Sequence, residues 1–328
     1  MPSLLSKLRA QDAAAETLRR ALREGRVHHA YLFDGPDGVG KELAAFGLAQ
    51  ALVCASPTED AQACGVCSAC VRAVVDPKTS RPKHPDIVVL ERGLYDPVQL
   101  GRRTPETQDL SIDQVRTLVL SHAAYAPHEG RARVFIVRRA EELSTAAANA
   151  LLKTLEEPIQ KMHFILVTSQ PDALLPTILS RVQRVRFAHL PESLVAELLA
   201  QGGVSQEIAA RVAPLAEGSM DTALSLCDEE ATESREAFVT RALEAINAPS
   251  LSVTLDLAEQ GKRDKVLLRT HMLALAARVA RTAKEPAQAE APERWATRYA
   301  HILQALRDLD ANGSPQLVLE TMFIRMRV

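Results

Sequence analysis

The feature that most limits what this chain can fold into is a glycine-rich loop set between two apolar segments. Residues 30–34 (AYLFD) have the composition of a short buried strand, and the loop GPDGVGK follows from Gly35 to Lys41. An apolar stretch over residues 43–54 then predicts a helix. In this order of strand, loop and helix, backbone N–H groups can surround a phosphate while the lysine reaches its outer oxygens. The loop therefore predicts an α/β unit with a phosphate-binding turn at the carboxyl end of a strand.

Further short apolar runs predict the rest of a sheet. Runs without polar alternation are typical of strands covered on both faces, as in a parallel sheet with helices on each side. A last segment alternates apolar and polar residues, as a more exposed strand does. We therefore expect an α/β core of about five strands. The further strands are predicted at residues 87–90, 134–137, 164–167 and 182–187.

Strand patterns stop near residue 190, and helical patterns replace them. Short helical patterns, separated by glycine-containing breaks at 202–203 and 218–219, predict a small helical module over residues 189–229. Longer helical patterns follow over residues 230–328. Residues 1–188 are accordingly expected to form the α/β core, and the rest of the chain to be all-α.

The charge balance and the apolar pattern exclude several classes of protein. Lys and Arg number 39 and Asp and Glu 41, which gives a formal net charge of −2. This balance argues against a protein that holds nucleic acid mainly by bulk positive charge. No apolar run approaches the ~18 residues of a membrane span, and the first residues lack the core of a signal peptide. We expect a cytoplasmic protein with no membrane partner, whose candidates for a local basic face are Arg138, Arg139, Arg184 and Arg186.

The glycine loop lacks the neighbouring groups that ATP hydrolysis requires. A phosphate loop ordinarily continues with Ser or Thr, whose hydroxyl binds Mg²⁺, but Glu42 follows the lysine here. An acidic pair that holds the metal and aligns the attacking water ordinarily follows a buried strand, but Arg138 and Arg139 stand at that place. We therefore expect no intrinsic ATPase activity. Two readings stay open, binding of ATP or ADP and mere retention of a turn, for the candidate residues Gly35, Gly38, Gly40 and Lys41.

Four of the five cysteines fall within one short stretch, at Cys54, Cys64, Cys67 and Cys70. In a large chain without a signal peptide such a cluster indicates a metal site rather than disulfides. Four thiolates at this spacing suit tetrahedral zinc in a closed, structural site. An iron–sulfur cluster is the alternative, but its usual pattern needs Cys at 74 and Pro at 75, where this chain has valines. Incidental thiols are the remaining reading.

Together these features resemble the clamp-loader subunits of the AAA+ class, and within that class the delta-prime type of bacterial DNA polymerase III. The resemblance runs along nearly the whole chain, and its most specific segment is AANALLKTLEEP at residues 147–158. The four cysteines after the first core helix also match. Further matching segments are residues 29–33 (HAYLF), 84–86 (HPD), 112–116 (IDQVR) and 177–182 (TILSRV).

The resemblance implies an architecture and several site residues. It implies an AAA+ core with a five-stranded parallel sheet, helices on both faces and a zinc module inserted at 54–70. It also implies an all-α three-helix lid at 189–229 and an all-α C-terminal collar for oligomerisation at 230–328. Arg181, in SRV where the family has Ser-Arg-Cys, would be an arginine finger for a neighbouring subunit, and Thr168 would lie at the nucleotide site. The start of the lid helix, at 218–222, carries no arginine for nucleotide.

The function expected from this resemblance is that of a non-hydrolysing clamp-loader subunit within the DNA polymerase III holoenzyme, a DNA-directed DNA polymerase. Its implied partners are gamma/tau and delta subunits in a hetero-pentameric ring, the sliding clamp transiently, and primer–template DNA through the assembled complex. One alternative is an ATP-hydrolysing gamma/tau-type subunit or a stand-alone AAA+ ATPase. Another is a zinc-dependent adaptor of the same fold without a role in replication.

Overall fold

The computed structural model divides the chain into two compact units, residues 1–224 and 225–328, which we call the first and the second unit. It describes residues 3–60, 62–103, 109–123, 125–129, 131–157, 161–247, 252–261, 265–284, 292–310 and 313–327.

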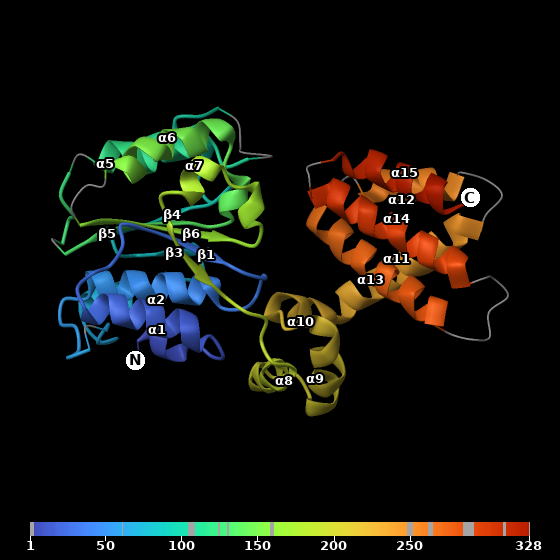
Figure 1. The fold of residues 1–328 in the computed structure, drawn as a ribbon, viewed down its shortest axis with the longest axis horizontal. Coiled ribbons are helices and arrows are strands. Elements are labelled where there is room, and N and C mark those ends of the chain that lie inside the picture. The colour runs from blue at the N-terminus through green and yellow to red at the C-terminus, as the bar shows by residue number, and fades with distance from the viewer. Residues whose placement is uncertain are drawn as a thin grey trace. The chain divides into compact units, whose positions relative to one another are not determined.

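A five-stranded sheet in which every pairing is parallel forms the centre of the first unit (Figure 1). The three inner strands of the sheet are buried along their whole length, apart from His163, because helices cover both faces. This arrangement confirms the predicted α/β core, a five-stranded parallel sheet with helices on both faces, with further helices following it along the chain. In their order across the sheet the strands are β4 (Ile87–Leu90), β5 (Arg133–Val137), β6 (Met162–Thr168), β1 (Ala30–Asp34) and β7 (Gln183–Arg186).

Helices α1 (Asp12–Arg23) and α2 (Lys41–Val53) cover one face of this sheet, and α6 (Thr145–Glu156) and α7 (Pro176–Leu179) cover the other (Figure 1). Helix α2 is apolar on nearly every side, which suits its position between the sheet and its neighbours. On the opposite face, Phe135 and Phe164 stack with ring centroids 5.2 Å apart and belong to a cluster of buried side chains. The same face holds the segment of α4 (Ile112–Gln114), η3 (Val115–Leu120) and α5 (Ser121–Ala123).

The cysteine region contains elements that the sequence did not predict. A short helix α3 (Ser68–Arg72) precedes an antiparallel pair of two-residue strands, β2 (Val75–Asp76) and β3 (Arg81–Pro82). Elements this short leave no periodic pattern in a sequence. The described part of the segment between β4 and α4 includes one turn of 3₁₀ helix, η2 (Pro97–Leu100). The remaining short 3₁₀ helices are η1 (Leu4–Lys7), η4 (Ala140–Glu142) and η5 (Pro171–Ala173).

The helical module predicted after the sheet begins with α8 (Glu192–Gln201) and α9 (Gln206–Val212), which continues into η6 (Ala213–Ala216). Helix α10 (Met220–Cys227) follows, and the boundary between the two units falls within it. The backbone N–H of Met220 donates to the carbonyl oxygen of Gly38 at 3.1 Å, so the start of α10 lies against the glycine loop. The division of the first 229 residues into core and lid stays a prediction.

The second unit is helical throughout its described residues. Its helices enclose one apolar core, to which Trp295 and Phe323 contribute, and the arginine Arg298 is buried with them beside the Trp295 ring. The helices are α11 (Glu229–Asn247), α12 (Ser252–Gly261), α13 (Lys265–Lys284), α14 (Pro292–Asp310) and α15 (Pro315–Met326).

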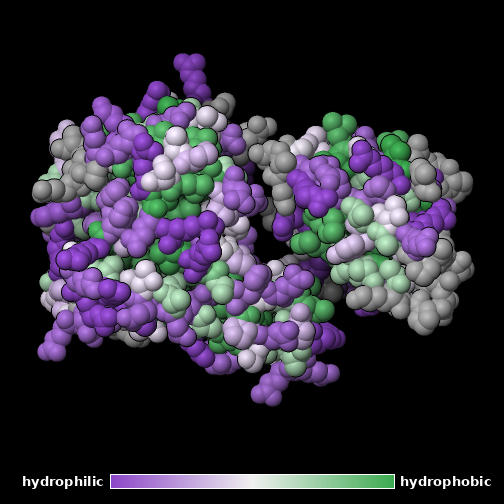
Figure 2. Space-filling view, in the orientation of Figure 1, coloured by the Kyte–Doolittle hydropathy of each residue, from purple (hydrophilic) through white to green (hydrophobic). Residues whose placement is uncertain are grey.

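Hydrophilic residues cover most of the face of the first unit that Figure 2 shows, with hydrophobic residues in small groups between them. Among the described residues, none of the helices combines the length and apolarity needed to cross a membrane.

Replacing Phe164 by alanine should destabilise the first unit by about 3–5 kcal/mol, because it removes a large side chain that is 2% exposed and leaves a cavity. Trp295, the only tryptophan in the chain, lies in the second unit, so its fluorescence can follow that unit separately. In urea titrations we expect an earlier transition by circular dichroism with an unchanged tryptophan transition. Val98→Ala, at a position that is 80% exposed, is the control. A loss below about 1 kcal/mol for Phe164→Ala would contradict this packing.

Candidate functional site

The glycine loop leaves the sheet where β1 ends and enters α2. In the register of the sheet Asp34 pairs with Thr168, so the ends of β1 and β6 lie side by side at the loop. Gly38 and Gly40 have φ angles of 69° and 99°, which side chains rarely tolerate. A Cβ at Gly38 would lie 2.4 Å from the backbone nitrogen of Asp221. The turn of a phosphate loop is therefore retained, and it is closely covered by the start of α10.

The ammonium group of Lys41 is bonded to oxygen atoms of the glycine loop itself. Its side chain is 6% exposed, and Nζ donates to the carbonyl oxygens of Gly35 and Pro36 at 2.6 and 2.5 Å. The carboxylate of Asp37 lies 3.4 Å from the same nitrogen. An ammonium group has three N–H donors, and all of them have oxygen partners here. A phosphate could reach this lysine only by displacing contacts within the loop.

Glu42 and Arg138 form an ion pair at the places where an ATP-hydrolysing subunit, or motor subunit, would bind magnesium. The Nε atom of Arg138 lies 3.2 Å from Oε2 of Glu42, and its Nη1 donates to Oε2 of Glu91 at 2.8 Å. The same Nη1 lies 3.3 Å from the carbonyl oxygen of Ser80 in the turn between β2 and β3. Partial burial raises the pKa of Glu42, the charge of Arg138 opposes this shift, and the nearby Glu91 and Asp221 add to it.

The prediction that Arg138 belongs to a local basic face is wrong, because the residue is only 9% exposed and is enclosed by these partners. Of the other arginines proposed for that face, Arg184 donates to Asp34, at 2.7 Å from Nε, and Arg139 is paired with Glu142. Arg186 is exposed on β7.

A carboxylate, Asp221, lies at the first turn of α10 beside the loop. Burial raises the pKa of Asp221, as does the charge of Asp37, while Lys41 lowers it. Phosphate binding depends on positive charge and free N–H donors. Around this loop the lysine is already bonded, and Asp37, Glu42 and Asp221 repel anions. The residues present therefore do not fit a magnesium nucleotide.

Thr168 ends β6 at the same edge of the sheet as the glycine loop. The residue is 1% exposed, and its Oγ1 accepts a hydrogen bond from the backbone N–H of Gln170 at 3.0 Å. The structure thus brings the five predicted nucleotide-site residues to one edge, where the hydroxyl of Thr168 is used to cap its own turn.

Arg181 lies at the end of α7, just before β7. Its Nη1 donates to the carbonyl oxygen of Thr177 at 2.8 Å and to Oγ of Ser180 at 2.9 Å. Its Nη2 lies 2.8 Å from Oε1 of Glu156 at the end of α6, and the side chain is 33% exposed. The guanidinium is therefore held at the surface by a carboxylate that another anion could replace.

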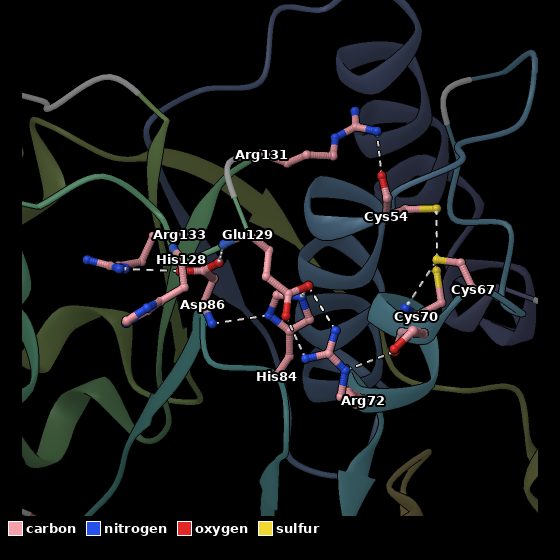
Figure 3. Close-up of polar contacts among 11 residues, drawn as sticks. Cys54, Cys67, Cys70, Arg72, His84, Asp86, His128, Glu129, Arg131 and Arg133 are labelled. Atoms are coloured by element: carbon pink, nitrogen blue, oxygen red, sulfur yellow. Dashed lines mark hydrogen bonds and ion pairs between the residues drawn. The ribbon is translucent and has the colours of Figure 1, made fainter.

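The four cysteines converge to a size that suits zinc. The sulfur of Cys54 lies 3.6 Å from that of Cys64 and 3.9 Å from that of Cys67, and Cys64 lies 3.9 Å from Cys70. All four sulfurs lie within 4.8 Å of one another. A tetrahedron with Zn–S bonds of about 2.3 Å has edges of about 3.8 Å, so the donor set fits a structural zinc ion. In Figure 3 the sulfurs of Cys54, Cys67 and Cys70 point toward one another from the end of α2 and from α3.

Backbone N–H groups favour the thiolate form of two of the four cysteines. The N–H groups of Val66 and Cys67 lower the pKa of Cys64. Burial raises the pKa of Cys67, but the N–H groups of Cys70 and Ala55 outweigh it and bring that pKa to about 6. Burial raises the pKa of Cys54 and of Cys70. Cys64 and Cys67 are therefore the cysteines that lose a proton most easily. This favours metal binding, because zinc binds thiolates.

A network of polar groups joins the cysteine module to the loop before β5 (Figure 3). Arg72 of α3 holds Glu129 through two hydrogen bonds of 2.6 and 2.8 Å. The other side of Glu129 faces His84 Nε2 at 3.2 Å, and Arg131 donates to the carbonyl oxygen of Cys54.

Nearby, Asp86 accepts from the backbone N–H groups of His128 and Glu129 and lies 3.3 Å from the buried Arg133. The sequence drew attention to residues 84–86 only as a matching segment. Their role, fixing the loop that touches the zinc site, depends on residues more than 40 positions away and leaves no local pattern.

Comparisons with known proteins agree with this geometry. The model of the family described as "DNA polymerase III, delta subunit" matches residues 10–191. The gamma/tau subunit of DNA polymerase III from Mycobacterium tuberculosis is 35% identical over 269 residues, which cover 79% of this chain and 43% of that protein. The delta' subunit from Bacillus subtilis is 29% identical over 229 residues, covering 70% and 63%.

A solved structure of a gamma subunit-related protein from Thermotoga maritima has a TM-score of 0.50 and 21% identity. It covers 95% of this chain and 98% of its own, and this likeness supports the fold alone. The chain thus spans less than half the length of the gamma/tau relative.

Purified protein should carry one zinc ion per chain, and Cys67→Ser should lose it. Three remaining thiolates leave the tetrahedral site open, so the module around 54–70 should loosen and the first unit should unfold earlier. Metal released by a thiol-blocking reagent, measured with a colorimetric zinc indicator, tests this. Cys227→Ser removes the one cysteine outside the cluster and should keep the full zinc content. Equal zinc in both variants would remove Cys67 from the site.

Proposed function

The chain belongs to the DNA polymerase III delta-subunit family, and from that premise we propose that it is a non-hydrolysing clamp-loader subunit of the delta-prime type. It would assemble with motor subunits of the gamma/tau type and with delta. Through that assembly it would act on the sliding clamp and on primer–template DNA. The assembly would operate in the cytoplasm, where thiols stay reduced and zinc–thiolate sites persist.

The single observation that carries this proposal is the closed glycine loop. ATP hydrolysis needs a metal ion at the phosphates and a base that orients the attacking water. The places for these groups are taken by Glu42 and Arg138, which bind each other. Lys41, which would stabilise the phosphates, is bonded to Gly35 and Pro36. A subunit built in this way contributes to the ring through its surfaces.

Arg181 is the residue through which we propose that it acts on a neighbour. An arginine supplied from a second subunit neutralises charge that develops on the phosphates during transfer, and such a residue can accelerate hydrolysis by about 10³–10⁵. In this chain the guanidinium is surface-accessible and paired with Glu156. Because an exposed ion pair contributes only about 0–1 kcal/mol, exchange of Glu156 for a phosphate is inexpensive.

Zinc and the helical parts take supporting roles in this proposal. Four thiolates leave no coordination position for a reacting water, so the zinc ion would hold residues 54–70 together and supply no catalysis. Residues 1–188 would be the core and 189–229 the lid. The helices of residues 230–328 would form the collar that keeps the subunit in the ring.

A motor subunit of the gamma/tau type is the second candidate, and the 35% identity with such a subunit favours it. Glu42 and Arg138 are the residues that argue against it. Steady-state ATP hydrolysis by the purified chain separates the two: we expect none above a no-protein blank. Turnover that depends on Mg²⁺ would establish the motor.

Replacing Arg181 by alanine should slow clamp loading by the reconstituted complex at least about tenfold and lower its DNA-stimulated ATPase, because one motor site loses its charge stabilisation. Arg181→Lys should restore only part of the rate, since lysine lacks the planar pair of donors. Lys153→Ala, on the exposed face of α6, controls for the loss of a surface cation. Loading and ATPase at wild-type rates for Arg181→Ala would refute the arginine-finger role.

A further inference from the structure

In this chain two charged side chains occupy the places of the groups that bind magnesium at a phosphate loop. In a phosphate loop that binds magnesium, the residue after the lysine supplies a hydroxyl and an aspartate after a buried strand supplies the counter-charge. Glu42 and Arg138 occupy these places, so the anion and the cation now both come from the protein. The 3.2 Å separation of Nε and Oε2 shows that the two side chains meet directly.

Arg138 contacts three elements near that position. It reaches Glu42 on α2, Glu91 just after β4 and the carbonyl oxygen of Ser80 in the β2–β3 turn. Its guanidinium also lies 5.3 Å from the centroid of the Phe46 ring. The Nε atom is fully buried and lacks a well-directed hydrogen bond, so the ion pair with Glu42 is its main compensation.

The carboxylates depend on Arg138 in turn. Burial raises the pKa of Glu42, and the charges of Glu91 and Asp221 raise it further, whereas the charge of Arg138 lowers it. Arg139, the other cation near Glu42, is 55% exposed and is paired with Glu142. Without Arg138, Glu42 and Glu91 would lose the cation that both of them contact. Carboxylate oxygens are the ligands that hard divalent cations prefer.

We propose that the guanidinium of Arg138 is a built-in replacement for the divalent cation of a phosphate loop. It joins α2, the end of β4 and the β2–β3 turn through two ion pairs and a hydrogen bond to a carbonyl oxygen. The first unit therefore keeps this edge of its sheet assembled with neither ligand. The proposal deepens the non-hydrolysing function, on which it rests for its meaning within the ring.

The test is rescue by a metal ion. In thermal melts of the full chain, Arg138→Ala should unfold at a lower temperature than the wild type. Addition of MgCl₂ or MnCl₂ should raise that midpoint by at least about 2 °C, the shift that about 1 kcal/mol produces in a domain of this size. The wild type should not respond to either salt, nor to ADP with MgCl₂, when KCl is used to match ionic strength.

Three further variants make the result specific. Arg139→Ala removes the adjacent exposed arginine and should show no rescue. Arg138→Gln keeps the polar stem without charge and should be rescued like alanine, which covers the case in which Arg138→Ala does not fold. Glu42→Gln combined with Arg138→Gln should lose the rescue, because it removes one proposed ligand.

A midpoint of the wild type that rises with magnesium as much as that of the variants would overturn the proposal. So would Arg138→Gln without a metal response. These outcomes are independent of the Arg181 measurements, since a failed arginine finger leaves the melts unchanged and failed rescue leaves clamp loading unchanged.

Discussion

Burial of α2 on nearly every side is the constraint on which both candidate sites depend. The helix begins at the glycine loop with Lys41 and Glu42 and ends beside Cys54, the first zinc ligand in the chain. Its thirteen residues make a rod of about 20 Å. Gln50, within the rod, accepts from the backbone N–H of Leu4 and donates to the carbonyl oxygen of Cys70. Because α2 is packed closely on nearly every side, neither of its ends can shift without disturbing the surrounding core.

The charges at the loop follow from the same enclosure. A cation buried near β5 needs carboxylates, and carboxylates crowded beside a sheet edge need a cation. Arg138 satisfies both requirements at once with Glu42 and Glu91. Arg133 and Asp86 repeat this solution at the other end of β5, where both side chains are almost wholly buried. Buried arginines thus form ion pairs with carboxylates at both ends of β5.

Much of the fold could be predicted because its signals are local. Each of the five strands leaves an apolar run or an alternation, and the glycine loop identifies the strand at which α2 begins. The four cysteines were found by their spacing alone. The sequence also identified Glu42 and Arg138 as departures from a motor, since each stands at a fixed offset from a recognisable motif.

What could not be predicted depends on contacts between distant residues. That Glu42 and Arg138 touch, that Glu91 completes the group, and that Asp221 faces the loop require the register of the sheet and the course of α10. The hairpin of β2 and β3 has strands of two residues, too short for any period. Arg138 was wrongly assigned to a basic face because arginines are usually exposed. Its burial is possible here because its partners compensate the charge.

The pair of Glu42 and Arg138 also bears on how such a chain can change over generations. A single substitution at either position toward a motor-like residue leaves the other charge without its partner. Breaking a fully buried pair costs about 3–5 kcal/mol, but the side chain of Glu42 is 52% exposed, so solvent screening makes the cost smaller here. In the proposed non-hydrolysing subunit, a gain of hydrolysis would therefore pass through a less stable intermediate or require both positions to change together. The ion pair would thus oppose that change one substitution at a time.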